Sequence, residues 1–313
     1  MRNHSGKVLI AAPVHQVLIE GFTNAGYECV MMENITQAIA PQMIHDCVGV
    51  ITSTRLQLNK ELLDAASQLR WIGRMGSGME VIDTAYAAEK GIACFSSPEG
   101  NSNAVAEHAL GMLLSLMKRI SRSNEEVKQG IWNREENRGY ELEGKTIGII
   151  GFGNTGRAFA KKLQGFDMRI LAYDKYNSGN IPPHIVNCKD LAPVYEQADI
   201  ISFHVPMQKD TENYLDDIFI TNMSKGFVLI NTSRGIVANS KALWKGLQSG
   251  KITGVCLDVW EQEPIGKMDK ESLEIFNQIV SLPQAIITPH IAGYSHEALY
   301  KMSEILLYKI LNA

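Results

Sequence analysis

A glycine pattern in the middle of the chain has the spacing of a phosphate-binding loop. Residues 151–156, GFGNTG, follow the apolar run TIGII and precede a helix-like stretch. Gly151 allows a tight turn, Gly153 lets the backbone approach a pyrophosphate, and Gly156 permits close packing of helix on strand. The first N–H groups of the helix would face the anion. The pattern predicts a dinucleotide site, with a purely structural turn as the alternative.

Asp174 supplies the second half of this pattern. It ends the next apolar run, RILAY, where a carboxylate can accept hydrogen bonds from an adenosine ribose. An acid at this position would repel the extra phosphate of NADP. We therefore expect NAD as the cofactor, whereas an ordinary aspartate at a strand end is the plain alternative.

Two residues suited to the chemistry of a keto acid also follow apolar runs. Arg234 follows FVLIN, and its guanidinium fork can pair with a carboxylate while it polarises a ketone. His290 follows AIITP, and its imidazole can donate a proton to a carbonyl oxygen as hydride reaches the carbon. Each residue alone has a plain alternative, as a surface arginine or a loop histidine. His108 and His204 are assigned no catalytic role.

Length and pattern predict two α/β domains that position these residues. The 313 residues exceed the size at which one hydrophobic core keeps growing. Short apolar runs alternate with helix-like stretches from residue 7, pause at an expected long helix over residues 102–130, and then restart with six further runs. We expect residues 102–290 to form the dinucleotide-binding domain and residues 1–101 with 291–313 to form the substrate domain.

Composition indicates a small-molecule partner. With 30 basic and 34 acidic residues the net charge is -4, which gives no reason to expect nucleic acid or a membrane surface. The five cysteines have no spacing typical of a metal site, and we interpret them as reduced thiols of a cytoplasmic protein. The N-terminal apolar run is too short for a signal peptide or a membrane span.

Ordered motifs along almost the whole chain resemble those of the D-isomer-specific 2-hydroxyacid dehydrogenase family, and within it the phosphoglycerate dehydrogenases. The motifs that carry the resemblance are Gly76-Ser77-Gly78 with Glu80 and Asp83, Asn101-Ser102 with Val105-Ala106-Glu107, residues 151–156, His204-Val205-Pro206, Asn231-Thr232-Ser233-Arg234-Gly235, Leu257-Asp258-Val259 with Glu261, Glu263 and Pro264, and Pro289-His290-Ile291-Ala292-Gly293. The resemblance implies two doubly wound parallel sheets, a flavodoxin-like substrate domain with an inserted Rossmann NAD-binding domain. Because the chain stops after one further helix, we expect no feedback by serine through a C-terminal regulatory domain.

The resemblance also implies roles for individual residues. It pairs Glu263 with His290, so that the carboxylate stabilises the imidazolium, and it makes Arg234 the third catalytic residue. The residues implied in cofactor binding are Val105, Gly151, Gly153, Asn154, Thr155, Gly156, Asp174, His204, Val205, Pro206, Thr232 and Asp258, of which Asp258 would bind the nicotinamide amide. For Val105, packing in a helix core explains the residue type equally well.

The substrate is less well defined by the sequence. The backbone of Gly76, Ser77 and Gly78 could bind the substrate carboxylate, with a glycine-rich turn as the alternative. Arg74 and Arg134 match the phosphoglycerate subgroup, but Arg55 is displaced by two positions from the arginine that helps bind the phosphate there. Either Arg55 replaces it or the substrate has no phosphate. Surface solvation explains each arginine singly.

Several alternatives stay open at this level. A glyoxylate or hydroxypyruvate reductase and a D-lactate dehydrogenase would use the same three catalytic residues on another 2-keto or 2-hydroxy acid. Formate dehydrogenase is disfavoured, because that pattern has Gln where Glu263 lies. A different class is an NADH-sensing protein similar to corepressors of this family. The resemblance further implies a homodimer built on the long helix and its following loop.

Overall fold

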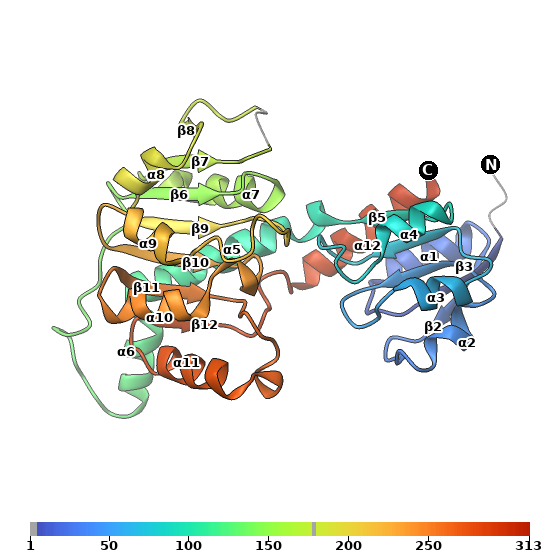
Figure 1. The fold of residues 1–313 in the computed structure, drawn as a ribbon, viewed down its shortest axis with the longest axis horizontal. Coiled ribbons are helices and arrows are strands. Elements are labelled where there is room, and N and C mark those ends of the chain that lie inside the picture. The colour runs from blue at the N-terminus through green and yellow to red at the C-terminus, as the bar shows by residue number, and fades with distance from the viewer. Residues whose placement is uncertain (1–4, 177–179) are drawn as a thin grey trace. The chain divides into compact units, whose positions relative to one another are not determined.

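The computed structural model describes residues 5–176 and 180–313, so the first four residues of the predicted substrate domain lie outside the described residues. The chain forms two compact units. One comprises the residues up to Ser102 together with Tyr294–Ala313, and the other comprises Asn103–Gly293. Each unit is built on one parallel sheet (Figure 1), which confirms the predicted fold class.

The first unit has a five-stranded sheet in the order β2-β1-β3-β4-β5, the flavodoxin-like arrangement. Its strands are β1 (Gly6–Ile10), β2 (Tyr27–Met31), β3 (Cys47–Thr52), β4 (Trp71–Arg74) and β5 (Ala93–Ser96). Its helices are α1 (Gln16–Asn24), α2 (Ala40–Ile44), α3 (Lys60–Ala65), α4 (Thr84–Glu89) and α12 (His296–Leu311). Every residue of β3 is buried, because helices cover both faces of the sheet.

Two apolar cores hold this first sheet, one on each face. Residues of α2, α3 and α4, including Ile44 and Leu62, pack on one face. Phe22 of α1 and Leu306 of α12 pack on the other face with Trp71 of the sheet. The C-terminal helix therefore completes the core of the N-terminal unit, which explains why two distant segments fold together.

The second unit has a seven-stranded sheet in the order β12-β11-β10-β9-β6-β7-β8. Its strands are β6 (Thr146–Ile150), β7 (Arg169–Tyr173), β8 (Ile185–Cys188), β9 (Ile200–Phe203), β10 (Phe227–Asn231), β11 (Ile252–Leu257) and β12 (Ala285–Ile287). The order reverses between β6 and β9, as in a Rossmann fold, and ligands of such sheets bind beyond the carboxyl ends of the strands at that point. The sequence predicted six strands here, and β8 is the additional one.

Helices cover both faces of this second sheet (Figure 1). Its helices are α5 (Pro98–Met117), α6 (Ile120–Lys128), α7 (Asn154–Lys162), α8 (Ala192–Gln197), α9 (Asp217–Asn222), α10 (Ser240–Gln248) and α11 (Lys270–Val280), with short 3-10 turns η1 (Leu163–Phe166), η2 (Gly235–Val237) and η3 (Ile265–Lys267). Helices α8 to α11 pack on one face through residues such as Phe219 and Leu243. Helices α5 and α7 pack on the other through Leu113 and Phe159.

The prediction of a single long helix over residues 102–130 is wrong in one respect. The helix ends at Met117, and Arg119 takes a left-handed conformation with φ 55° before α6 begins at Ile120. A left-handed residue cannot continue a right-handed helix. The segment is therefore two helices, of which only α5 contributes to the core.

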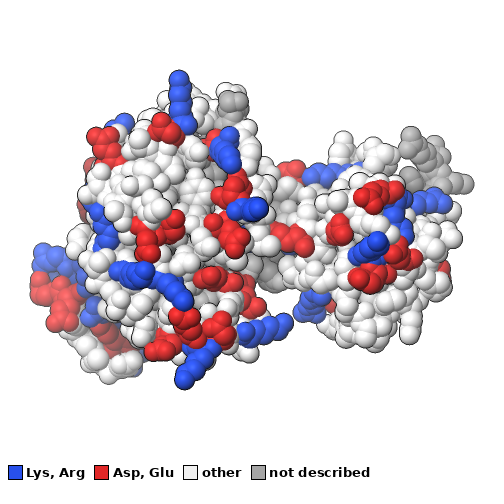
Figure 2. All heavy atoms as spheres, viewed as in Figure 1, with Lys and Arg blue, Asp and Glu red and all other residues white. Residues whose placement is uncertain are grey.

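The surface is of mixed charge. Figure 2 shows Lys and Arg side chains interspersed with Asp and Glu over the visible face. In the described part of the chain, no helix is both long enough and apolar enough to cross a membrane.

Candidate active site

The glycine loop after β6 has the geometry of a phosphate-binding turn. Gly151 has φ 91°, and a Cβ at this position would collide with the backbone of His204. A Cβ on Gly156 would overlap the carbonyl of Gly151, so the start of α7 packs directly on the loop. Gly153 is different, because nothing lies within 4 Å of the position of its missing Cβ. This open space beside an uncapped helix N-terminus fits a pyrophosphate.

Asp174 lies beside this loop at the end of β7. Its Oδ2 accepts a hydrogen bond from the Phe152 N–H at 2.6 Å, and its Oδ1 accepts one from the Tyr176 N–H at 2.9 Å. The carboxylate is half-buried, and its bond to the Phe152 N–H attaches it to the glycine loop. A carboxylate offers about four lone-pair sites, so it can also accept bonds from a ribose.

Arg234 follows β10, in a loop that packs closely against the segment after β11. The Asn231 side chain donates to the Arg234 carbonyl at 2.9 Å and so holds the turn. The next residue, Gly235, lies directly against the backbone of Trp260, where a Cβ would overlap the Trp260 carbonyl. This close approach brings the Arg234 loop beside the loop that carries Glu263.

Glu263 and His290 form a hydrogen-bonded pair. The two side chains meet at 2.7 Å between His290 Nδ1 and Glu263 Oε2, while Glu263 Oε1 accepts the Trp260 N–H at 2.6 Å. The hydrogen bond and the charge of Glu263 raise the pKa of His290, with a further contribution from Asp258, against the opposing effects of burial and Arg234. Burial opposes ionisation of Glu263, but its hydrogen bonds from His290 and Trp260 hold its pKa below the usual range.

Arg234 contributes to the electrostatics of both members of this pair. Its positive charge lowers the pKa of Glu263 and of His290. The three side chains therefore share one electrostatic environment at the carboxyl edge of the seven-stranded sheet. A guanidinium, an imidazole with a raised pKa and its carboxylate partner can bind an acid and transfer one proton.

Asp258 is buried beneath this site. Its carboxylate accepts hydrogen bonds from the Thr288 hydroxyl at 2.6 Å, from the Ile291 N–H at 2.8 Å and from the Ala292 N–H at 2.8 Å. Its oxygens are thus used to organise the loop that carries His290. The predicted bond to a nicotinamide amide stays a prediction.

The remaining predicted cofactor residues divide into buried and accessible groups. His204 is buried, its Nε2 lies 2.9 Å from the Ser202 hydroxyl, and burial lowers the pKa of its imidazole to about 3. Val105 is also buried, on α5. Among the described residues, the buried Thr232 hydroxyl finds no hydrogen-bond partner, which suits a group that binds a ligand. Val205 is half-buried and Pro206 is exposed.

The substrate residues predicted in the first unit lie at the end of β4 or in the loops after β3 and β4. Arg74 is buried and donates to the Met75 carbonyl at 2.8 Å, and its guanidinium occupies the space that a Cβ on Gly76 would need. The Gly76 N–H donates to the Ser97 hydroxyl at 3.2 Å, so it is used within the chain. Ser77 and Gly78 come next in this loop. Arg55 is exposed and donates to the Asn34 side chain at 2.8 Å.

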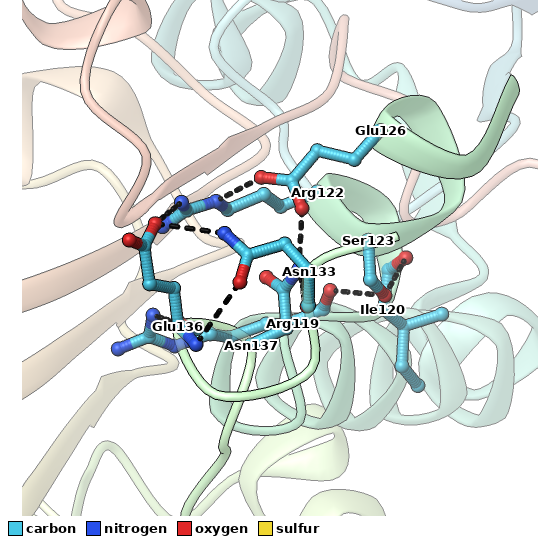
Figure 3. A network of polar contacts seen from close by, with 8 residues as sticks. All are labelled: Arg119, Ile120, Arg122, Ser123, Glu126, Asn133, Glu136 and Asn137. Carbon is cyan, nitrogen blue, oxygen red and sulfur yellow. Dashed lines mark hydrogen bonds and ion pairs between the residues drawn. The ribbon is translucent and has the colours of Figure 1, made fainter. Parts of the chain in front are cut away.

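Arg134, predicted to bind substrate, lies in the second unit, in the loop after α6. Polar contacts hold this loop on the helix (Figure 3): Arg122 pairs with Glu126 at 2.8 Å and with Glu136 at 3.6 Å, and the Asn137 amide donates to Glu126. Arg134 itself is exposed.

The structure adds two residues that sequence reasoning did not assign to the site. The Nε2 of His108, on α5, lies 2.9 Å from the Thr288 hydroxyl and 3.6 Å from Asp258 Oδ1. Thr288 and His108 are 180 positions apart, so no local spacing could predict this contact.

In the described part of the chain, no group of three His, Cys, Asp or Glu side chains could hold a metal ion.

Comparisons with known proteins identify the family of this chain. The family model "D-isomer specific 2-hydroxyacid dehydrogenase, NAD binding domain" matches residues 110–292. A hydroxypyruvate reductase of Thermotoga maritima is 32% identical over 90% of this chain and 89% of that protein. A D-3-phosphoglycerate dehydrogenase of Archaeoglobus fulgidus is 30% identical over 98% of this chain, which spans only 57% of that protein's length.

Solved structures give the same result. The D-lactate dehydrogenase of Aquifex aeolicus, determined with NAD and lactic acid, is 26% identical and superposes with a TM-score of 0.82 over 97% of this chain and 94% of that one. The chain belongs to the D-isomer specific 2-hydroxyacid dehydrogenase family and contains the NAD-binding domain of that family.

Proposed function

We propose that this protein is an NAD-dependent oxidoreductase that interconverts a D-2-hydroxy acid and its 2-keto acid. The observation that carries the proposal is the 2.7 Å hydrogen bond between Glu263 and His290, within the electrostatic influence of Arg234. A protein that only senses NADH has no need of an imidazole kept ready to carry a proton. The NADH sensor is therefore the weaker alternative.

The site residues divide the work as follows. His290 Nδ1 is bound to Glu263, so the other ring nitrogen, Nε2, is assigned as the atom that gives a proton to the substrate oxygen. Glu263 stabilises the imidazolium before transfer and fixes the ring orientation. Arg234 pairs with the substrate carboxylate and polarises the ketone. Bound NADH supplies the hydride for reduction.

NAD fits the residues at the glycine loop. The open space at Gly153 and the uncapped start of α7 would take the pyrophosphate, including contacts to Asn154 and Thr155. Asp174 would accept the ribose hydroxyls and disfavour NADP. The Thr232 hydroxyl, which has no hydrogen-bond partner among the described residues, is a candidate contact for the nicotinamide end of the cofactor. Thr232 directly follows β10, at the carboxyl edge of the sheet.

For the substrate, we infer a phosphorylated three-carbon acid, 3-phosphohydroxypyruvate in the reducing direction. Support comes from the relatives named D-3-phosphoglycerate dehydrogenase and from the exposed guanidinium groups of Arg55 and Arg134, which are able to bind a phosphate. Arg74 is the third arginine of this proposal.

Unphosphorylated hydroxypyruvate is the second candidate, and three observations favour it. The Arg55 guanidinium already donates to Asn34, and Arg74 is buried with a hydrogen bond to Met75. The hydroxypyruvate reductase of Thermotoga maritima also matches this chain over nearly its whole length. Glyoxylate and pyruvate belong in the same test panel.

A second copy of the chain is the partner that we propose. Ile120, Val127, Ile131, Trp132 and Tyr140 are exposed on α6 and its following loop, and Trp132 has 79% of its surface accessible. The polar contacts in Figure 3 hold this segment in a defined shape, which suits an interface. Exposed apolar side chains gathered in one segment are typical of such surfaces.

The test of the proposed function is direct. The protein is mixed with NADH or NADPH and with each of 3-phosphohydroxypyruvate, hydroxypyruvate, glyoxylate and pyruvate, and absorbance at the NADH band is followed. We expect NADH-dependent reduction of at least one acid, with the D-hydroxy acid as product. Tight binding of NADH with no turnover of any acid would favour the sensor instead.

A further inference from the structure

The backbone of His290 is in an unusual conformation. Its φ is 56°, in the left-handed region that a non-glycine residue rarely adopts and that raises its free energy. Its N–H donates to the Asp258 carbonyl at 2.7 Å and to the Thr288 carbonyl at 3.1 Å. Such a conformation persists only where the surroundings hold it, so the groups that hold it affect where the imidazole lies.

The Asp258 carboxylate is the main contact of this loop. It accepts the N–H groups of Ile291 and Ala292, the two residues that follow His290, and the hydroxyl of Thr288, two residues before it. Its side chain has 1% of its surface exposed. A buried carboxylate with three charge-assisted hydrogen bonds therefore holds the loop on both sides of the imidazole.

The donor and the acceptor of each hydrogen bond in this network can be assigned from the Asp258 carboxylate, at which the network ends. An ionised carboxylate only accepts, so the Thr288 hydroxyl gives its single proton to Asp258 Oδ1 at 2.6 Å. The Thr288 hydroxyl oxygen can then only accept from His108, which requires a proton on His108 Nε2, 2.9 Å away. The network runs from His108 through Thr288 to Asp258, and helix α5 is thereby connected to the His290 loop.

We propose that His108 and Thr288 are positioning residues for His290, which act through Asp258 to hold the loop of residues 288–292 so that the imidazole meets Glu263. This inference rests on the proposed function, in which His290 carries the proton. His108, on α5, thereby acquires a role in the site, although its hydrogen bond described above is to Thr288 and not to Glu263, His290 or the glycine loop.

The network also acts on the charge of the site. The charged groups that act on His290 are Glu263, Asp258 and Arg234, and the first two favour its imidazolium form. If the loop relaxes, the bond to Glu263 lengthens and the imidazolium loses stabilisation. If His108 and Thr288 only stabilised the fold, their replacement would leave the pKa of His290 unchanged. This pKa therefore distinguishes a positioning role from a purely structural one.

The experiment uses the full chain with carbon-13-labelled histidine and follows the His290 ring signal by NMR as a function of pH. The signal is assigned by its loss in His290→Asn. Thr288→Val removes the hydroxyl and keeps the branched shape, whereas His108→Leu removes the donor and His108→Gln restores one. Thr211→Val is the matched control, because its buried hydroxyl is also hydrogen-bonded but not to the His290 loop.

We expect Thr288→Val to lower the pKa of His290 by on the order of one pH unit. His108→Leu should lower it in the same direction, His108→Gln should stay close to the parent, and Thr211→Val should leave it unchanged. In turnover, Thr288→Val should lower kcat about tenfold with little change in the Kd for NADH, since it misplaces the imidazole and not the cofactor.

The outcomes separate this proposal from the proposed function. If His290 titrates identically in the parent, Thr288→Val and His108→Leu, the positioning role is wrong, even where the parent reduces a keto acid. If Thr288→Val does not fold, the two His108 variants decide the question alone. If the parent reduces no keto acid but the titrations shift as expected, the positioning role stands and the dehydrogenase assignment fails.

Discussion

Gly235 lies so close to Trp260 that no side chain can fit between their backbones, since a Cβ on Gly235 would overlap the Trp260 carbonyl. Arg234 precedes this glycine, and the Trp260 N–H is bound by Glu263. The contact therefore sets the spacing between the residue proposed to bind the substrate and the residue proposed to stabilise the imidazolium.

Gly235→Ala should separate these two loops. We expect kcat/KM for keto-acid reduction to fall on the order of 100-fold, because misplacement of catalytic groups by about 1 Å has an effect of this size. Gly266→Ala is the matched control, since nothing lies within 4 Å of its missing Cβ, and it should behave as the parent. Equal activity of the two variants would show that the Gly235 contact does not position the site.

Arg234→Lys keeps the positive charge and removes the planar fork. A lysine cannot form the two parallel hydrogen bonds to a carboxylate, so transition-state binding should weaken by about 2 kcal/mol or more, roughly 30-fold in kcat/KM. Steady-state kinetics with each 2-keto acid measure this change. An unchanged kcat/KM for every acid would remove Arg234 from the substrate site.

Asp174→Ala should reduce the preference for NADH over NADPH, because it removes a ribose acceptor and a negative charge. It also removes the acceptor of the Phe152 N–H in the glycine loop. Asp174→Asn separates the two effects, since its amide oxygen can still accept that bond while the charge is absent. We expect both variants to narrow the ratio of kcat/KM for the two cofactors. Equal use of both cofactors by the parent would contradict the assignment.

The identity of the substrate is tested by its phosphate. If Arg55, Arg74 and Arg134 bind the phosphate, 3-phosphohydroxypyruvate should be reduced far better than hydroxypyruvate, and added salt should narrow the gap because it screens exposed charges. Arg55→Ala and Arg134→Ala should then lower kcat/KM for the phosphorylated acid only. A parent that prefers hydroxypyruvate would move the protein to the reductase alternative.

Much of the fold could be predicted because its strands are apolar runs with clear breaks. The exception, β8, is a four-residue strand with two exposed residues that pairs with β7 alone. The break between α5 and α6 was also missed, since neither Gly nor Pro marks it. The left-handed Arg119 that causes it has its side chain bonded to the Glu136 carbonyl in the later loop.

The site could be predicted in part for a topological reason. Arg234 and His290 each follow a strand of one parallel sheet, so their loops meet at one edge. Their polar supports could not be predicted, because the bonds of Asp258 depend on the register of β11 with β12, in which Leu257 pairs with Ile287. The contact between His108 and Thr288 joins positions too far apart for any spacing rule.

Removing the charge of Glu263 tests whether this carboxylate controls the protonation of His290. Glu263→Gln keeps an acceptor for His290 Nδ1 but removes the charge, so the imidazolium loses its main stabilisation and the pKa of His290 should fall. Reduction needs the protonated ring, so as pH rises its rate should be lost at a lower pH in the variant than in the parent. Oxidation needs the neutral ring and should remain active to more acidic pH.

The decisive measurement is the pH dependence of kcat/KM in both directions, with saturating cofactor, for the parent and for Glu263→Gln. His290→Ala serves as the reference and should lower both rates by roughly 100- to 10,000-fold, the usual contribution of a positioned acid-base group. We expect both profiles to move to lower pH in Glu263→Gln. Profiles that superimpose on those of the parent would show that Glu263 does not control His290 and that the proposed catalytic pair is wrong.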